Sequence, residues 1–156
     1  MLNIEGPLDG LHVNRKVENW GKTFDIEFDI VLEKRIELSR GALSLIHLDH
    51  DHDHKIHHTH DFGVIIYKNK LAFEYKHEAD KWTILATYDT ELNKAYHIEF
   101  KQFKTTDDKT KRIVKINDEV QLDKEIENVY AFTGTLMVGD FDDKDDYGRM
   151  SNLKIS

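Results

Sequence analysis

The sequence lacks cysteine altogether and has a single proline, Pro7, among its 156 residues. Without cysteine there is no disulfide framework, no cysteine-ligated zinc finger and no thiol nucleophile. No stretch approaches the ~20 consecutive apolar residues that a membrane-spanning helix needs. Residues 1–6 do not resemble a secretory signal peptide either, so we expect none in this sequence.

The sequence is also poor in positive charge. It has 22 lysines and arginines against 30 aspartates and glutamates, which gives a formal net charge of −8 with histidine neutral. Nucleic acids and anionic membranes are bound through a basic face, so this balance argues against both as partners. Hydrophobic residues make up 39% of the chain, which is enough for one domain with a real core, covering residues 1–156.

Short apolar runs separated by polar turns recur along the chain, and none shows a convincing helical period. In the segment 23–32, Phe24, Ile26, Phe28 and Ile30 alternate with acidic residues, which predicts a strand with one buried face. About ten or more short strands predict an all-β fold of two packed antiparallel sheets. The other predicted strands cover 42–48, 63–67, 71–75, 82–87, 95–103, 112–116, 120–122, 129–133, 136–139 and 148–155.

The order of segments in the second half resembles one family. Residues 114–120 look like a strand, a tight turn and a strand, and residues 148–155 close with glycine, an apolar residue and Asn-Leu-x-Ile. Together with 127–132 and an early strand beginning near Trp20, they resemble concanavalin A-like and laminin G-like jelly-roll domains of lectin type. The resemblance runs from about Trp20 to Ile155. It implies a two-sheet jelly-roll sandwich, usually extracellular, that binds glycans or proteins, often with calcium. Our leading hypothesis is a non-catalytic binding module of this type.

The chain departs from this family pattern at residues 49–61, within a segment that holds seven of the ten histidines. Imidazole is a common ligand for borderline metals, and three or four ligands at about 2.0–2.2 Å make a site. In an extended chain the alternating aspartates could orient the imidazole rings. This histidine segment, residues 47–61, therefore predicts binding of Zn²⁺, Cu²⁺ or Ni²⁺. The candidate ligands are His47, His50, His52, His54, His57, His58, His60, Asp49, Asp51, Asp53 and Asp61.

Two other interpretations of the histidine segment stay open. It can be a solvated polar loop whose histidines bind nothing. It can also act as a pH switch, because near pH 6 several of its histidines would gain positive charge beside its own aspartates.

A second acidic segment, residues 140–147, contains five aspartates and is a candidate calcium site because Ca²⁺ prefers oxygen ligands. It does not match an EF-hand loop, and a solvated loop is the simpler interpretation. Trp82 is a candidate ligand contact through stacking on a sugar, although an aromatic residue in a sandwich usually belongs to the core. The candidate calcium ligands are Asp140, Asp142, Asp143, Asp145 and Asp146.

One enzymatic alternative is a glycosidase. The run Asp25, Glu27, Asp29 superficially resembles the carboxylate run on one strand face of glycoside hydrolases that share the jelly-roll fold. Such chemistry needs a carboxyl group held protonated beside a second one. The run differs in sequence from the glycosidase pattern and lies early in the chain, so we interpret it as the solvated face of an amphipathic strand and do not expect an enzyme.

Overall fold

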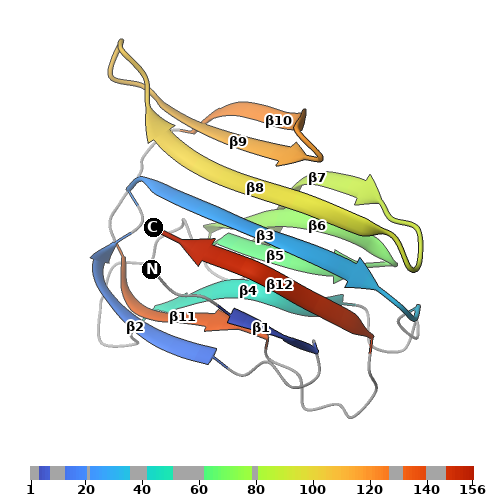
Figure 1. Cartoon of the computed structure of the whole chain (residues 1–156). Coiled ribbons are helices and arrows are strands. Elements are labelled where there is room, and N and C mark those ends of the chain that lie inside the picture. Colours follow the sequence, from blue (N-terminus) through green and yellow to red (C-terminus); the bar gives the residue numbers. More distant parts are fainter. Residues whose placement is uncertain are drawn as a thin grey trace.

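The computed structural model describes residues 4–7, 13–20, 22–35, 42–50, 62–78, 81–126, 132–139 and 147–156. Within these ranges every regular element is a β-strand, and the strands form two six-stranded sheets that pack face to face (Figure 1). All neighbouring strands run antiparallel. The predicted all-β, two-sheet sandwich is therefore confirmed.

The first sheet, which we call sheet A, has the strand order β1-β12-β3-β8-β9-β10. Its central pair, β3 and β8, comes from distant parts of the sequence and is drawn in blue and yellow in Figure 1. The strands of sheet A are β1 (Ile4–Pro7), β12 (Gly148–Ile155), β3 (Phe24–Leu32), β8 (Ala95–Lys104), β9 (Thr110–Ile116) and β10 (Glu119–Ile126).

The second sheet, sheet B, has the order β2-β11-β4-β5-β6-β7 and lies behind sheet A in Figure 1. Because β4 to β7 follow one another in the sequence and in the sheet, most of sheet B is a meander. Its strands are β2 (Val13–Trp20), β11 (Phe132–Val138), β4 (Ala42–His50), β5 (Phe62–Tyr67), β6 (Lys70–Glu78) and β7 (Lys81–Asp89).

The core lies between the two sheets and follows from the period-two pattern of the strands. Along β3 every second residue is buried, from Phe24 to Leu32, and β8 and β9 alternate in the same way. Phe73 of sheet B meets Phe100 of sheet A with ring centroids 5.7 Å apart, and both side chains are buried. The inward residues predicted for β3 are therefore confirmed, β8 follows the same pattern, and the acidic and polar residues between the buried ones face outward.

Two tight hairpin turns also agree with the sequence. Lys68 and Asn69 join β5 to β6, and Asn117 and Asp118 join β9 to β10. All four residues have positive φ, as the two central residues of a type I′ turn require. These turns fix the register of their hairpins.

Three features differ from the predicted strands. Strands β1 and β2 were not predicted, and one strand, β11, stands where two were expected. Strand β4 continues to His50, because Asp49 and His50 pair with residues of β11. In addition, no helix in the described ranges is long and apolar enough to cross a membrane.

Candidate functional site

The outer face of sheet A carries four chemically active side chains at its centre. Glu27 and Asp29 lie on β3, and His97 and Glu99 lie on β8. In the strand register Asp29 is opposite His97, and Glu27 is opposite Glu99. Since residues two apart share one face of a strand, all four side chains project from the same side of the sheet. We call this group the β3–β8 cluster.

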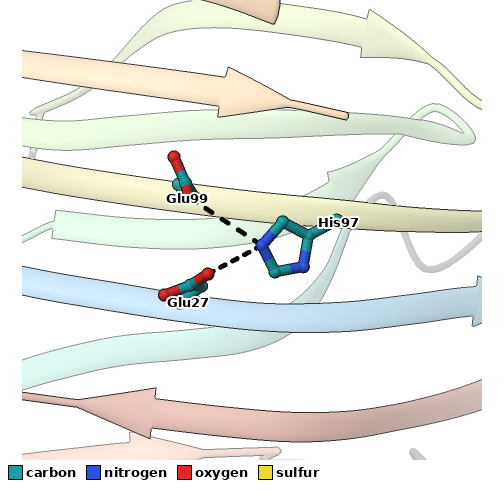
Figure 2. A group of neighbouring side chains, drawn as sticks. All are labelled: Glu27, His97 and Glu99. Atoms are coloured by element: carbon teal, nitrogen blue, oxygen red, sulfur yellow. Dashed lines mark hydrogen bonds and ion pairs between the residues drawn. The ribbon is translucent and has the colours of Figure 1, made fainter. Parts of the chain in front are cut away.

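His97 is held through both nitrogens of its ring. Nδ1 lies 2.6 Å from Oδ1 of Asp29, and Nε2 lies 2.8 Å from Oε1 of Glu27. Glu99 is further away, with Oε1 3.9 Å from Nε2 (Figure 2). A carboxylate only accepts hydrogen bonds, so when Asp29 and Glu27 are both ionised the two short contacts need a ring that is protonated on both nitrogens.

The backbone of His97 is fixed by the turn between β9 and β10. The backbone N–H of His97 donates to Oδ1 of Asn117 at 2.9 Å, and the backbone N–H of Asn117 donates to the carbonyl of His97, also at 2.9 Å. On the other side of β3, Asn152 of β12 donates from Nδ2 to Oδ2 of Asp29 at 2.8 Å. The cluster is therefore anchored by two neighbouring parts of sheet A, the turn between β9 and β10 and strand β12.

These contacts shift two pKa values in opposite directions. The hydrogen bond to Asp29 raises the pKa of His97; partial burial lowers it by less, and the hydrogen bond to Glu27 raises it further. For Asp29, partial burial favours a higher pKa, but hydrogen bonds from Asn152 and His97 and the charge of His97 leave the pKa below its ordinary value. The arrangement thus favours an ion pair.

Chemically, the cluster can hold a cation. One atom each from Glu27, His97 and Glu99 lies within 4.8 Å of the others, and imidazole with two carboxylates is a ligand set for a divalent ion. The raised pKa of His97 favours protonation of the ring, and the protonated ring places a positive charge between the carboxylates. The carboxylates of β3 lie on the partly exposed outer face of the strand, as the sequence predicts, and two of them, Glu27 and Asp29, also contact His97.

The predicted metal ligands lie almost entirely outside the described residues. His47 is described: its Nδ1 lies 2.9 Å from the hydroxyl of Ser44, and the side chain is half-buried. Asp49 and His50 stand in β4 opposite Thr135 and Gly134 of β11, and their backbone alone is described. The ligands outside the described residues are His52, His54, His57, His58, His60, Asp51, Asp53 and Asp61.

The other two predicted sites are the sugar contact of Trp82 and the calcium site of the acidic segment. Trp82 lies in β7 opposite Lys76 of β6, and only its backbone is described. The candidate calcium ligands of the acidic segment lie outside the described residues: Asp140, Asp142, Asp143, Asp145 and Asp146.

A separate cavity of about 290 Å³ opens between β2 of sheet B and the end of β12. Arg15 and Trp20 line it from β2, Leu136 from β11 and Ile155 from β12. The ring of Trp20 stacks on Phe24 with centroids 5.6 Å apart, so the tryptophan closes the core at this end. The cavity shares no lining residue with the β3–β8 cluster.

Neither a family model nor a curated protein matches this sequence. Several solved structures share its fold. The receptor-binding domain of botulinum neurotoxin D gives a TM-score of 0.67 at 14% identity over 97% of this chain, which spans only 39% of that chain. A galectin of Caenorhabditis elegans gives 0.60 at 10% identity, over 97% of this chain and 95% of the galectin. A carbohydrate-binding module of Bacillus subtilis gives 0.53 at 17% identity, over 87% and 76%.

At these identities the similarity establishes a shared architecture. The structurally similar proteins are β-sandwich domains of lectin-like or carbohydrate-binding type, which agrees with the jelly-roll sandwich implied by the sequence resemblance. The function has to be argued from the sites of this chain.

Proposed function

We propose that this chain is a non-catalytic binding module of lectin type, related to concanavalin A-like and laminin G-like domains, that binds a glycan on the outer face of sheet A. The observation that carries the proposal is the fixed polar array of the β3–β8 cluster on that face. Its side chains are already held by hydrogen bonds, so ordering them on binding a polar ligand costs little entropy.

The family of folds supports the choice of ligand class. One similar structure is a carbohydrate-binding module and another is a galectin. A further one is a receptor-binding domain, which keeps a protein or receptor ligand as the alternative. If the module acts on external glycans or receptors, it works outside the cell, as the sequence resemblance implies.

A glycan array with two matched variants tests the proposal. Ser151 of β12 is opposite Asp29 on the outer face, so Ser151→Arg should block access to the cluster. Thr87→Arg adds the same side chain at an exposed position of β7 in sheet B and should leave binding unchanged. Loss of glycan binding in Ser151→Arg alone supports the proposal. Equal binding by both variants, or no glycan bound by the unmodified protein, contradicts it.

We further propose that the histidine segment binds Zn²⁺ or Cu²⁺. The support is its composition, with seven histidines interspersed with aspartates between residues 47 and 61. Isothermal titration of either metal into protein without an affinity tag tests this. The proposal is contradicted if no heat of binding is measured at micromolar metal, or if the heat is the same after all seven histidines are changed to Asn.

Calcium-dependent recognition through the acidic segment is the second candidate function, favoured by five aspartates in residues 140–147. It predicts that glycan or protein binding requires calcium and is lost when Asp142 and Asp145 are changed to Asn. Binding that is the same in a calcium chelator excludes it.

A glycosidase has weaker support. The hydrogen bonds that tie Asp29 to Asn152 and His97 favour its ionised form, whereas a general acid must be held protonated. We therefore expect no hydrolysis of β-glucans. Hydrolysis that disappears in Glu27→Gln would reverse this conclusion.

A further inference from the structure

We propose that Glu27, His97 and Glu99 bind one divalent transition-metal ion on the outer face of sheet A, at a site independent of the histidine segment. The site adds a resident ion to the proposed binding module. Its ligands come from β3 and β8, the central strands of sheet A, and all three are placed in the structure (Figure 2).

The backbone register brings the ligands together. Glu27 and Glu99 are directly opposite each other, which places their Cβ atoms about 4.5–5.5 Å apart. Two like charges in this position destabilise a sheet unless a cation lies between them. His97 is two residues before Glu99 on the same strand, so its side chain lies on the same face, beside the two glutamates. When the imidazole ring of His97 loses a proton, it offers them a neutral nitrogen ligand.

The distances fit a metal centre after small side-chain movements. Metal–ligand bonds of about 2.0–2.1 Å in a tetrahedral site place the ligand atoms roughly 3.3–3.4 Å apart. Nε2 of His97 is 2.8 Å from Oε1 of Glu27 and 3.9 Å from Oε1 of Glu99, so the two distances lie on either side of that value. The oxygens of Glu27 and Glu99 lie within 4.8 Å of each other. The two glutamates would therefore move by roughly 1 Å, which a change in their side-chain torsions allows.

Asp29 supplies the support that a histidine ligand needs. Its Oδ1 holds Nδ1 of His97 at 2.6 Å, and Asn152 in turn holds Oδ2 of Asp29 at 2.8 Å. A carboxylate in this position keeps the proton on Nδ1 and leaves Nε2 free to bind the metal. The incoming ion then replaces the Nε2 proton that hydrogen-bonds to Glu27.

Three lysines lie near the carboxylates on this face of sheet A. Lys101 is 3.6 Å from Asp25, Lys154 acts on Asp29 through its charge, and Lys115 is opposite Glu99 in β9.

The fourth ligand position of the proposed site faces solvent, because the side chains of His97 and Glu27 are 36% and 28% exposed. Nitrogen and carboxylate ligands in a four-coordinate site suit Zn²⁺, which is the probe we choose.

The experiment starts from a background variant in which the seven histidines of the histidine segment are Asn, which removes their metal binding. Zn²⁺ is titrated by calorimetry, and the ring nitrogens of His97 are followed by NMR. We expect one ion per chain, with a shift of Nε2 and retention of the proton on Nδ1. Glu27→Gln and Glu99→Gln should each weaken binding at least tenfold, and Asp29→Asn should weaken it about 10- to 100-fold.

Asp25→Asn is the matched control, because it removes an acidic group from the same face of β3 and should leave Zn²⁺ affinity unchanged. The glutamine variants keep the shape of glutamate, and amide NMR spectra check that they are folded. The site is overturned if the background variant binds no Zn²⁺ at millimolar metal, or if the glutamine variants bind it as tightly as the background. Since the seven histidines of the segment are replaced in this background, a failure here says nothing about metal binding by the unmodified histidine segment.

Discussion

Among single residues, His97 links the chemistry of sheet A to pH. In metal-free buffer its raised pKa means that folding favours the charged ring. The stabilisation is complete below the unfolded pKa of about 6.5 and is lost as pH rises through the higher folded pKa.

We therefore expect the free energy of unfolding in a chelating buffer to fall between pH 6 and pH 8.5. In His97→Gln this decrease should be smaller, because the variant lacks the titrating imidazole. The cluster is half-exposed, so the difference should be no more than about 1 kcal/mol. Urea denaturation at both pH values measures it, and an NMR titration should show His97 titrating above pH 6.5. The same pH dependence in His97→Gln would contradict the argument.

Arg112 is a residue of a different kind, because it stabilises the fold from inside. It is 1% exposed and donates from Nε and Nη2 to Oε1 of Gln102, at 3.1 and 2.6 Å. Its guanidinium also lies over the rings of Phe24 and Phe100. Gln102→Leu removes the acceptor of two charge-assisted bonds.

We expect Gln102→Leu to destabilise the protein by about 2–3 kcal/mol, since a hydrogen bond to a charged group contributes about 1.5–3 kcal/mol and its loss leaves the charge buried. Thermal or urea denaturation measures the change. Gln121→Leu, at an exposed position of β10, is the control and should stay within about 0.5 kcal/mol of the unmodified protein. Equal effects of the two substitutions would show that the hydrogen bonds between Arg112 and Gln102 do not contribute to the free energy of unfolding.

At the scale of elements, Gly148 shows how two strands are locked together. It begins β12 and pairs with Leu32 of β3, and a Cβ atom added to it would lie 2.1 Å from the carbonyl oxygen of Val31. Beside it the carbonyl of Tyr147 accepts hydrogen bonds from the backbone of Glu33 and Lys34. The close approach of the two strands therefore requires glycine.

Gly148→Ala should force β12 away from β3 and destabilise the protein by about 3 kcal/mol, as for other overpacked sites. In urea denaturation the midpoint should fall while the m-value stays the same. Ser151→Ala, in the same strand but half-buried on the outer face, should change stability by less than about 0.5 kcal/mol. A midpoint for Gly148→Ala equal to that of the control would rule out the close packing.

The strands differ in how far the sequence predicts them. β3 and β8 were predicted because buried residues alternate with outward-facing ones along most of their length. β12 was predicted from the family resemblance, because its alternation is interrupted at Ser151 and Asn152. β2 has apolar residues only at Val13, Val17 and Trp20, because it lies at the edge of sheet B with one partner strand. β1 is four residues long and contains Pro7, which an edge position tolerates. Such edge strands form by pairing with segments that are distant in the sequence, so no local sequence pattern predicts them.

The same limit explains the candidate site. The histidine segment stands out by composition alone, whereas Asp29 and His97 are separated by 68 residues. Each strand showed outward polar residues, but only the register that places Asp29 opposite His97 turns them into one site. A sequence pattern predicts which face a residue takes; it does not predict which residue of another strand stands beside it.

For the whole molecule, the dominant property is negative charge that the histidines can cancel. The formal net charge is −8 with neutral histidines, and protonation of all ten would bring it to about +2. The isoelectric point of about 5.6 falls where histidines carry much of their charge. Since seven of them lie within residues 47–60, most of this change is concentrated in one segment.

We expect the protein to associate at low ionic strength near pH 5.6, where its net charge vanishes and the positive histidine segment of one molecule can meet the acidic surface of another. Light scattering between pH 4.5 and 7.5 measures this, and about 0.15 M salt should suppress it. The variant with seven histidines changed to Asn has fewer groups to protonate, so its association should move to lower pH. An association maximum at the same pH in both proteins would mean that the histidine segment does not control the charge of the molecule.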